Sequence, residues 1–289
     1  MMAEGSGMTE QRPTVADEIE RYLLTGETDL LHAAWSGDFM QRAERAHEDL
    51  RGALVSAVRQ RVEGLKPPPD PDADTVNLTR AKVAPMVRGL FSRAERDTVL
   101  AALEQSVIFV TSANIEQLLF GRGFDSTTWT MANLYLAGFG AKLLGDDPPD
   151  IVGFSVDATC FVSPQYFAEE GPFADFVVHE VAHIFHNCKR PAIGLRQTRR
   201  KEWLLDIEYL KRETFAYACE AYARVLERSN KSRAGRQALA EEYGRESRIS
   251  DERIDAEEIA DIVRAAAAAR NGWKVILARC SPTTKHGRI

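Results

Sequence analysis

The sequence predicts an α+β protein that is predominantly helical and carries one small sheet. Apolar residues recur at helical spacing along most of the chain, whereas only residues 106–111 (SVIFVT) and 151–162 (IVGFSVDATCFV) have the pattern of strands. Hydrophobic residues make up 44% and charged residues 28% of the 289 residues, so the chain can bury a sizeable core.

The N-terminal part is expected to be a helical region that follows a disordered tail. Residues 1–13 are mostly small and polar, which is typical of a loose terminus. Residues 14–66 form the predicted helical region, because apolar residues recur there three and four positions apart. The clearest apolar stripe in this region consists of Leu50, Leu54, Val58 and Val62.

A proline-rich segment marks the expected domain boundary. The stretch KPPPDPDAD (66–74) holds four prolines in six positions. Proline lacks a backbone N–H and clashes with the preceding turn of a helix, so this stretch is expected to be a stiff, extended linker. We therefore predict a linker over residues 67–75 and a second domain over residues 76–289.

The first half of the second domain is expected to supply the sheet. Residues 76–105 show helical periodicity, and residues 106–111 follow as a buried strand. In residues 151–162 apolar side chains occupy every second position, which predicts a half-buried strand or a tight hairpin. The dipeptide Gly-Pro at 171–172 predicts the start of the next helix, because proline is favoured at the first helical position.

The rest of the chain is expected to be mainly helical. Residues 189–201 are predicted to form a loop, and a long helix is predicted from about Trp203 to Leu226. Residues 254–270 are rich in alanine, which favours a further helix. Residues 271–280 (NGWKVILARC) are expected to add a final strand or a packing segment.

The stretch DFVVHEVAHIFHNC (175–188) contains a potential metal site. On a helix, His179 and His183 lie one turn apart and point the same way, so both imidazoles can bind one ion. Neutral imidazole suits Zn²⁺, and Glu180 would lie close to a water in the open fourth position. This is the HExxH pattern of zinc peptidases, in which the glutamate is the general base.

The residues around this motif are apolar on most of the expected helix. A helix of this kind is usually buried, and burying two histidines and a glutamate is costly unless they are paired or coordinate a metal ion. A metal ion is therefore the preferred explanation. The alternatives are a chance match with hydrogen-bonded core histidines, or a site that has lost its function.

A zinc ion that keeps a position open for water usually has three protein ligands. The continuation HExxHxxGxxH is absent, because position 186 is histidine and position 189 is lysine. His186 lies about 10 Å along the helix axis from His179, so the two rings do not easily share one ion. We expect His186 to lie behind a ligand or near the cleft.

A glutamate on the following helix is the expected third ligand. Within residues 201–227, Glu213, Tyr217, Glu220 and Arg224 form one polar stripe that is surrounded by alanines, which allow two helices to approach closely. We predict that Glu213 binds the metal and that Glu220 accepts a hydrogen bond from a ligand histidine. The acids that remain alternatives to Glu213 are Glu202, Asp206 and Glu208. The stripe could instead be the solvent face of an amphipathic helix.

The motif HEVAH, followed about thirty residues later by ETFAYACE, resembles the gluzincin group of zinc metallopeptidases. The resemblance covers roughly residues 150–226. It implies a zincin-like catalytic core, in which a small sheet packs on two site helices and its edge strand lies above the metal. Residues 151–162 occupy the place expected of that edge strand. The resemblance also implies Zn²⁺ as the cofactor and a protein or peptide as the substrate.

We therefore expect a zinc-dependent metallopeptidase in which Glu180 takes a proton from the attacking water and returns it to the leaving amine. The candidates for stabilising the oxyanion are His186, Tyr209, Tyr217 and Tyr222. An extended substrate could pair with the edge strand. The alternative is a zincin-fold binding or regulatory protein that hydrolyses nothing.

Composition argues against other classes of function. The net charge of −6 does not predict a nucleic-acid-binding protein. No apolar run approaches the roughly 20 residues that a membrane-spanning helix needs, and the first residues do not have the pattern of a secretory signal. The four cysteines form no CxxC pair, so we expect neither disulfides nor a thiolate metal site, and a cytoplasmic location.

Overall fold

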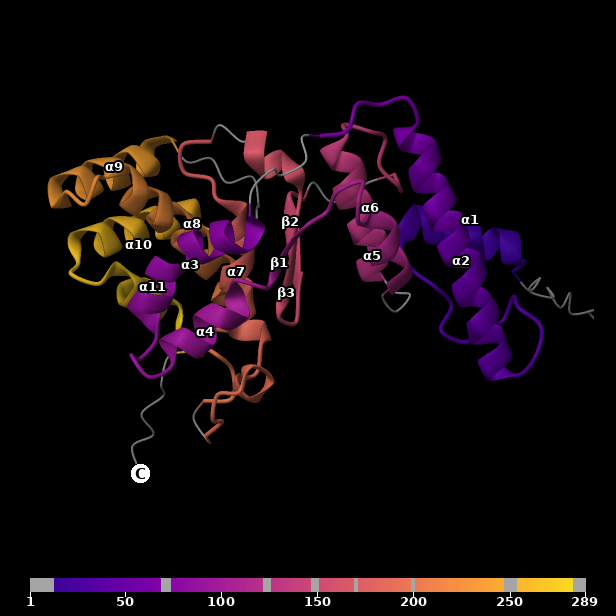
Figure 1. The fold of residues 1–289 in the computed structure, drawn as a ribbon, viewed down its shortest axis with the longest axis horizontal. Helices are drawn as coiled ribbons and strands as arrows, with labels where there is room; N and C mark the ends of the chain where they lie inside the picture. The colour runs from indigo at the N-terminus through magenta and orange to yellow at the C-terminus, as the bar shows by residue number, and fades with distance from the viewer. Residues whose placement is uncertain are drawn as a thin grey trace, which may run out of the picture. The chain divides into compact units, whose positions relative to one another are not determined.

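The structure is a computed structural model that describes residues 13–68, 74–121, 126–146, 151–168, 171–198, 201–246 and 254–282. The described residues are predominantly α-helical and include one three-stranded sheet, which confirms the predicted α+β class (Figure 1). Most of the tail predicted over residues 1–13 lies outside the described residues, as do residues 69–73 of the predicted linker.

The chain divides into two compact units that differ from the predicted domains. The first unit consists of Met1–Pro68 and Val110–Ile151, and the second of Pro69–Phe109 and Val152–Ile289. Residues 110–151 were expected in the second domain, but their helices α5 (Ile115–Gly121) and α6 (Ser126–Gly138) pack against α2 of the first unit. Helix α6 is buried around most of its circumference, so it needs cover on several sides, which α2 and α5 provide.

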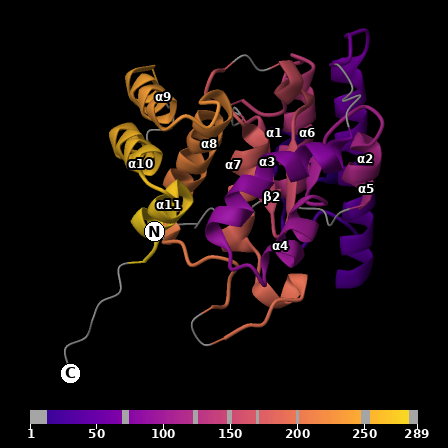
Figure 2. The ribbon, with the colours of Figure 1, turned by 60° about the vertical axis from the view of Figure 1, so that its left-hand side comes forward.

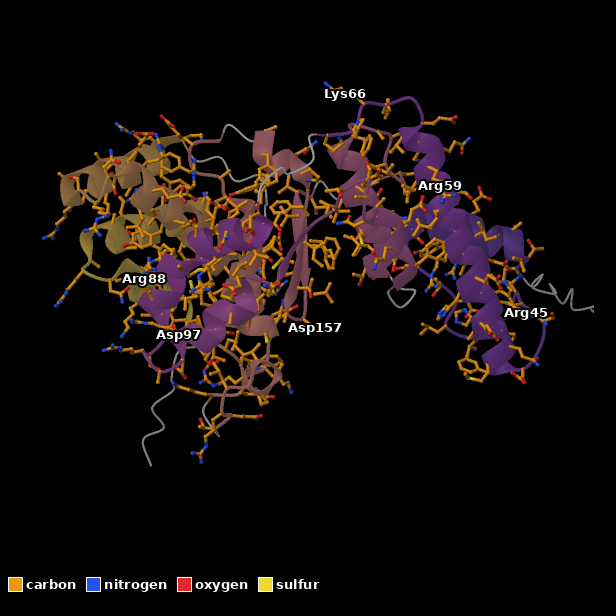
Figure 3. All side chains as sticks on the ribbon, viewed as in Figure 1. Arg45, Arg59, Lys66, Arg88, Asp97 and Asp157 are labelled. Carbon is orange, nitrogen blue, oxygen red and sulfur yellow. The ribbon has the colours of Figure 1, made fainter. Side chains whose placement is uncertain are left out.

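The predicted N-terminal helical region is two helices, α1 (Val15–Thr25) and α2 (Phe39–Val62). Gly26 ends α1 with a φ of 72°, a conformation that favours glycine. The α2 helix begins at a capping box between Asp38 and Gln41. Arg59 on α2 forms an exposed ion pair with Glu116 on α5 (Figure 3).

The sheet of the second unit has the strand order β1-β3-β2. Strand β1 (Val107–Phe109) runs parallel to β3 (Thr159–Val162), and β2 (Gly153–Val156) runs antiparallel to it. The strand predicted at 106–111 is confirmed, and residues 151–162 form the tight hairpin. Asp157 is at the tip of this hairpin with a φ of 53° (Figure 3). The order leaves β2 at an edge of the sheet.

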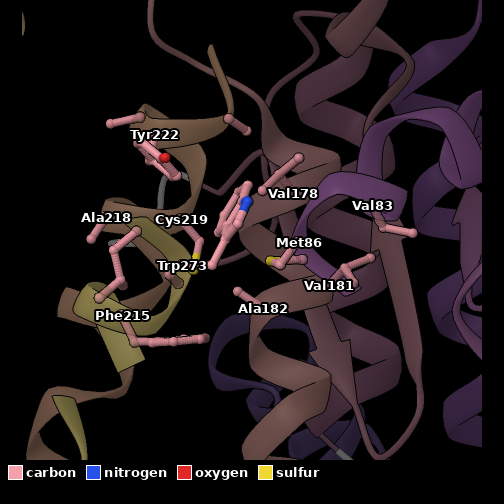
Figure 4. Packing of buried hydrophobic residues seen from close by; sticks show 14 of the residues in the cluster. Val83, Met86, Val178, Val181, Ala182, Phe215, Ala218, Cys219, Tyr222 and Trp273 are labelled. Atoms are coloured by element: carbon pink, nitrogen blue, oxygen red, sulfur yellow. The ribbon is translucent and has the colours of Figure 1, made fainter. Parts of the chain in front are cut away.

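Helices pack on the sheet and supply most of the core of the second unit. Helix α7 packs against β2, β3, α3 and α8, and α8 packs in turn against α9, α10 and α11 (Figure 2). Figure 4 shows the apolar core where α3, α7, α8 and α11 meet, with Met86, Val181, Phe215 and Trp273 among its buried residues. The bounds of these helices are α3 (Thr75–Leu90), α4 (Arg96–Leu103), α7 (Phe176–Asn187), α8 (Arg212–Arg228), α9 (Arg233–Glu246), α10 (Ala256–Ala268) and α11 (Gly272–Cys280).

The helix start predicted at Gly171-Pro172 is wrong. Helix α7 begins at Phe176, and Asp175 is its N-cap, because the Asp175 carboxylate accepts a hydrogen bond from the backbone N–H of Val178 at 3.2 Å. Aspartate is among the strongest N-cap residues, and here it overrides the weaker preference of proline for the first helical position.

The helix predicted from Trp203 also begins later, at Arg212. The backbone before it is held instead by the end of α7: the N–H of Leu204 donates to the carbonyl of Cys188, and the N–H of Leu205 donates to the carbonyl of Phe185. These bonds satisfy backbone groups that a helix would otherwise use. The loop predicted over residues 189–201 contains a short 3₁₀ helix, η2 (Arg190–Ile193).

The C-terminal predictions are confirmed in part. The helix predicted over residues 254–270 is α10, whereas residues 272–280 form helix α11, so the strand alternative for 271–280 is wrong.

All four cysteines are free and buried. Among the described residues, no helix is long and apolar enough to cross a bilayer.

Candidate metal centre

Helices α7 and α8 bring three potential metal ligands together. His179 and His183 lie one turn apart on α7, and their Nε2 atoms are 3.3 Å apart. Glu213, in the first turn of α8, places its Oε2 atom 3.4 Å from His183 Nε2 and 3.8 Å from His179 Nε2. Within the part of the chain that the structure describes, these three residues are the one group of His, Cys, Asp and Glu side chains found close enough to hold an ion.

The spacing of these atoms fits a zinc ion. Two atoms that each lie about 2.0–2.1 Å from one tetrahedral Zn²⁺ are about 3.3–3.4 Å apart. The separations between His179, His183 and Glu213 are 3.3, 3.4 and 3.8 Å, so only a small adjustment would bring all three onto one ion. Two imidazoles and one carboxylate are also a ligand set found in catalytic zinc sites.

Small side chains on α8 explain the close approach of the two helices. Ala216 is fully buried, Ala223 is nearly so, and the alanines between them are buried too. Glu213 lies at the N-terminus of α8, where the helix dipole favours a negative charge. The stripe that begins at Glu213 is therefore not simply a solvent face, because its third member, Glu220, is buried against α7.

The charges of the site favour a bound cation. Burial alone would lower the pKa of His179, but the nearby carboxylates of Glu213 and Glu220 outweigh it and raise that pKa to about 10. Burial alone would raise the pKa of Glu213, but the nearby imidazoles of His179 and His183 hold that pKa well below the usual range. Carboxylates that stabilise a proton on a histidine will also stabilise a metal ion in its place.

Glu180 lies beside the potential ligands but is not one of them. Its side chain is buried, and its Oε2 atom has no hydrogen-bond partner. Burial raises the pKa of the Glu180 carboxyl, although the nearby His179 and His183 act in the opposite direction. A buried carboxylate oxygen without a partner is costly, so its presence here suggests a partner that binds at the site, such as water or substrate.

Strand β2 covers Glu180 through a glycine. A Cβ atom on Gly153 would lie 2.9 Å from Glu180 Cγ, 3.1 Å from Glu180 Oε1 and 3.1 Å from the carbonyl oxygen of Phe161. Only glycine therefore allows the edge strand to lie this close to the glutamate.

Glu220 contacts the Nδ1 atom of His179, the first of the three potential ligands. Its Oε2 atom lies 3.0 Å from His179 Nδ1, as the sequence predicted, and its Oε1 atom accepts a hydrogen bond of 2.7 Å from the backbone N–H of Asp175. A carboxylate on the second nitrogen of a histidine fixes the orientation of the ring and increases its basicity.

His186 contacts the Nδ1 atom of His183, the second potential ligand, as Glu220 contacts that of His179. Its Nε2 atom lies 3.0 Å from His183 Nδ1. Burial, together with the nearby charges of His183 and Arg212, lowers the pKa of His186 to about 4, so its ring is neutral at pH 7 and can accept a hydrogen bond. This contact leaves His183 Nε2 to face Glu213 and His179.

The three tyrosines that are candidates for stabilising the oxyanion lie in different surroundings. The ring of Tyr217 packs edge-on against His179, with the ring centres 4.5 Å apart. Tyr209 is exposed, and the Arg212 guanidinium stacks on its ring at 4.1 Å. Tyr222 is buried in the core against Trp273 and is not available to a substrate.

The other acids weighed as third ligand lie outside the site. Glu202 forms an exposed ion pair with Lys189. Asp206 is exposed, and Glu208 precedes the 3₁₀ helix that leads into α8. None of the three is in the group that could hold an ion.

Comparisons with known proteins add no assignment. The chain has no significant match among protein-family models, curated proteins or solved structures. The site must therefore be interpreted from its own geometry.

Three residues at or near this site were not anticipated from the sequence: Gly153, Asp175, and Lys82, whose Nζ atom lies 2.8 Å from Asp175 Oδ2. An aspartate directly before an apolar helical run is a recognised N-cap signal, so Asp175 could have been found. The contacts of Lys82 and Gly153 join segments far apart in the chain, and no local pattern predicts them.

Proposed function

We propose that this protein is a zinc-dependent metallopeptidase that hydrolyses peptide bonds. The observation that supports this function best is the cluster of His179, His183 and Glu213 beside the buried Glu180. The separations of the three potential ligand atoms are close to those that one tetrahedral ion needs, and Glu180 carries an oxygen that no protein group satisfies.

In the proposed mechanism, His179, His183 and Glu213 hold the ion. The bound ion would supply Lewis-acid chemistry, which makes water more acidic and polarises the substrate carbonyl. Glu180 would accept the proton of the attacking water and deliver it to the leaving amine. Burial favours this role, because it raises the pKa of Glu180 and so makes the carboxylate a stronger base.

The surroundings of the site support a peptide substrate and a zincin-like core. Strand β2 is antiparallel to β3, lies at the edge of the sheet and packs on α7. An extended peptide could add to such an edge and so pass over Glu180. Tyr217 packs against His179 and is the remaining candidate for an oxyanion donor, because the contact of His186 with His183 Nδ1 puts His186 behind that ring. The four free cysteines are consistent with a cytoplasmic enzyme.

The first test of this proposal is the metal content of the purified protein. After exposure to zinc and desalting, elemental mass spectrometry should find about one zinc per chain in the wild type and little in His183→Ala, since structural and catalytic zinc needs its full ligand set. His47→Ala, in the first unit, is the matched control and should keep its zinc. Absence of zinc in a folded wild-type protein would refute the metal site.

Hydrolysis is tested separately on the zinc-loaded protein. Incubation with a mixture of unstructured peptides should give cleavage products that disappear after chelation and return with zinc. A protein that binds zinc but cleaves no member of a broad peptide mixture would be a binding or regulatory protein instead.

The contact between Gly153 and Glu180 gives a second test of the mechanism. We expect Gly153→Ala to lower peptide hydrolysis on the order of 100-fold, because the added Cβ displaces the general base and misplaced catalytic groups cost this much. Zinc content should not change. Gly52→Ala is the control, because an added Cβ there meets no atom within 4 Å. Full activity in Gly153→Ala would show that Glu180 does not need this position.

A further inference from the structure

We propose that Lys82, on α3, is a positioning residue for the metal centre and acts through Asp175 and Glu220 on the ligand His179. This inference rests on the proposed metal site and adds a residue that touches none of the ligands. It predicts that metal affinity depends on a lysine from outside the two helices that carry the ligands.

Lys82 lies between the two site helices. Its Nζ atom is 2.8 Å from Asp175 Oδ2, at the start of α7, and 2.8 Å from Glu227 Oε1, on α8. The side chain of Asp175 is 1% exposed and that of Lys82 is 16% exposed, so this ion pair is largely removed from water. One ammonium group therefore ties the beginning of α7 to α8.

Asp175 passes this constraint directly to the metal ligands. Its carbonyl accepts a hydrogen bond of 3.0 Å from the backbone N–H of His179. Its carboxylate caps α7 by accepting from the N–H of Val178 at 3.2 Å. Its own backbone N–H donates to Glu220 Oε1 at 2.7 Å. Asp175 thus contacts both the peptide that carries the first ligand and the carboxylate that orients its ring.

Glu220 completes the connection. Its two carboxylate oxygens have separate tasks, since Oε1 is held by Asp175 and Oε2 lies 3.0 Å from His179 Nδ1. A shift of Asp175 must therefore move Glu220, His179 or both. The connection from Lys82 to His179 runs through hydrogen bonds and one ion pair without a gap.

The need for a cation at position 82 follows from burial. The carboxylates of Asp175 and Glu220 are both buried, and Glu220 accepts a hydrogen bond from the backbone N–H of Asp175. Each ionised carboxylate in such a site is costly without compensation. Lys82 supplies the opposite charge for Asp175. Removing one partner of a buried ion pair leaves the other uncompensated, which is strongly destabilising. Without Lys82, we expect the Asp175 carboxylate to move toward water and to shift the start of α7, and with it the backbone N–H of Asp175 that holds Glu220.

The experiment compares Lys82→Met with Arg80→Met. Both remove a charge from α3, but Arg80 forms an exposed pair with Glu104, away from the site. Zinc affinity is measured by competition with a chromophoric chelator. The expected result is about a 10-fold increase in Kd for Lys82→Met, the lower end of the cost of losing a group that is hydrogen-bonded to a metal ligand, because Lys82 acts on His179 through Asp175 and Glu220. Arg80→Met should change Kd less than about threefold, because exposed ion pairs contribute little.

Two further measurements separate positioning from general stability. The visible absorption spectrum of the Co²⁺-substituted protein, which reports the ligand geometry, should change in Lys82→Met and not in Arg80→Met. Lys82→Arg, which keeps the charge, should recover much of the zinc affinity. A spectrum and Kd equal to those of the wild type in folded Lys82→Met would overturn the proposal.

A double variant covers the case in which Lys82→Met does not fold. Lys82→Met with Asp175→Asn removes both charges and keeps an N-cap side chain, so no buried charge is left unpaired. It should fold and bind zinc more weakly than the wild type, and wild-type affinity in this variant would also overturn the proposal. The two proposals fail in different ways. If the wild-type protein binds no zinc, the metal site itself is refuted. If the wild type and the variant bind zinc equally well, only the role of Lys82 is refuted.

Discussion

Glu180→Gln is expected to abolish peptide hydrolysis while the protein keeps its fold and its zinc. Glutamine has nearly the shape of glutamate but cannot accept a proton, so only the general-base step is lost. General acid–base catalysis contributes about 100- to 10,000-fold to the rate, and kcat/KM should fall by that factor. The side chain is buried beside the ligands without being one, so zinc binding should persist.

The measurement for Glu180→Gln is kcat/KM on a peptide that the wild type cleaves, together with zinc content on the same preparation. Glu116→Gln is the matched control, because it makes the same chemical change at an exposed ion pair of the first unit. Undiminished cleavage by a clean preparation of Glu180→Gln would rule out Glu180 as the base and leave the metal site intact.

Glu213→Ala is expected to weaken zinc binding more than any change behind the ligands. It removes one of three ligand atoms and leaves the two histidines, whereas losing a partner behind a ligand costs about 10- to 100-fold. We therefore expect Kd to rise more than about 100-fold. Equilibrium dialysis against buffered zinc would measure it.

The control for Glu213→Ala is Glu202→Ala, which removes an acid that lies outside the site in an exposed ion pair with Lys189. It should bind zinc as the wild type does. Full zinc occupancy in Glu213→Ala at limiting metal would assign the third ligand to another acid, of which Glu220 is the nearest to His179.

The histidine pair was predictable because its geometry is local. A spacing of four residues on a helix is enough to place His179 and His183 together, whatever the rest of the fold does. Glu213 was predictable from the stripe that it starts, even though α8 begins nine residues later than expected at about Trp203. The stripe from Glu213 to Arg224 needs only a helix over these residues, and α8 (Arg212–Arg228) provides it.

What could not be predicted depends on contacts between distant segments. The Gly-Pro cue at 171–172 was outweighed by the cap at Asp175, and that cap is reinforced by Lys82, more than ninety residues earlier in the chain. The packing of α5 and α6 against α2 is equally non-local. Periodicity shows which face of a helix is apolar, but not which other helix covers it.

The interleaved order of the two units has a consequence for synthesis on the ribosome. Strand β1 emerges before residues 110–151, yet its partner β3 emerges after them, and Cys160 follows Val107 by about 50 residues, or about 3–10 s of translation. The first unit thus has all its segments while α3, α4 and β1 still lack the hairpin and α7. The nascent second unit must remain unassembled through that interval. Glu213 is translated later still, so the proposed metal centre can form only after α8 has also been synthesised.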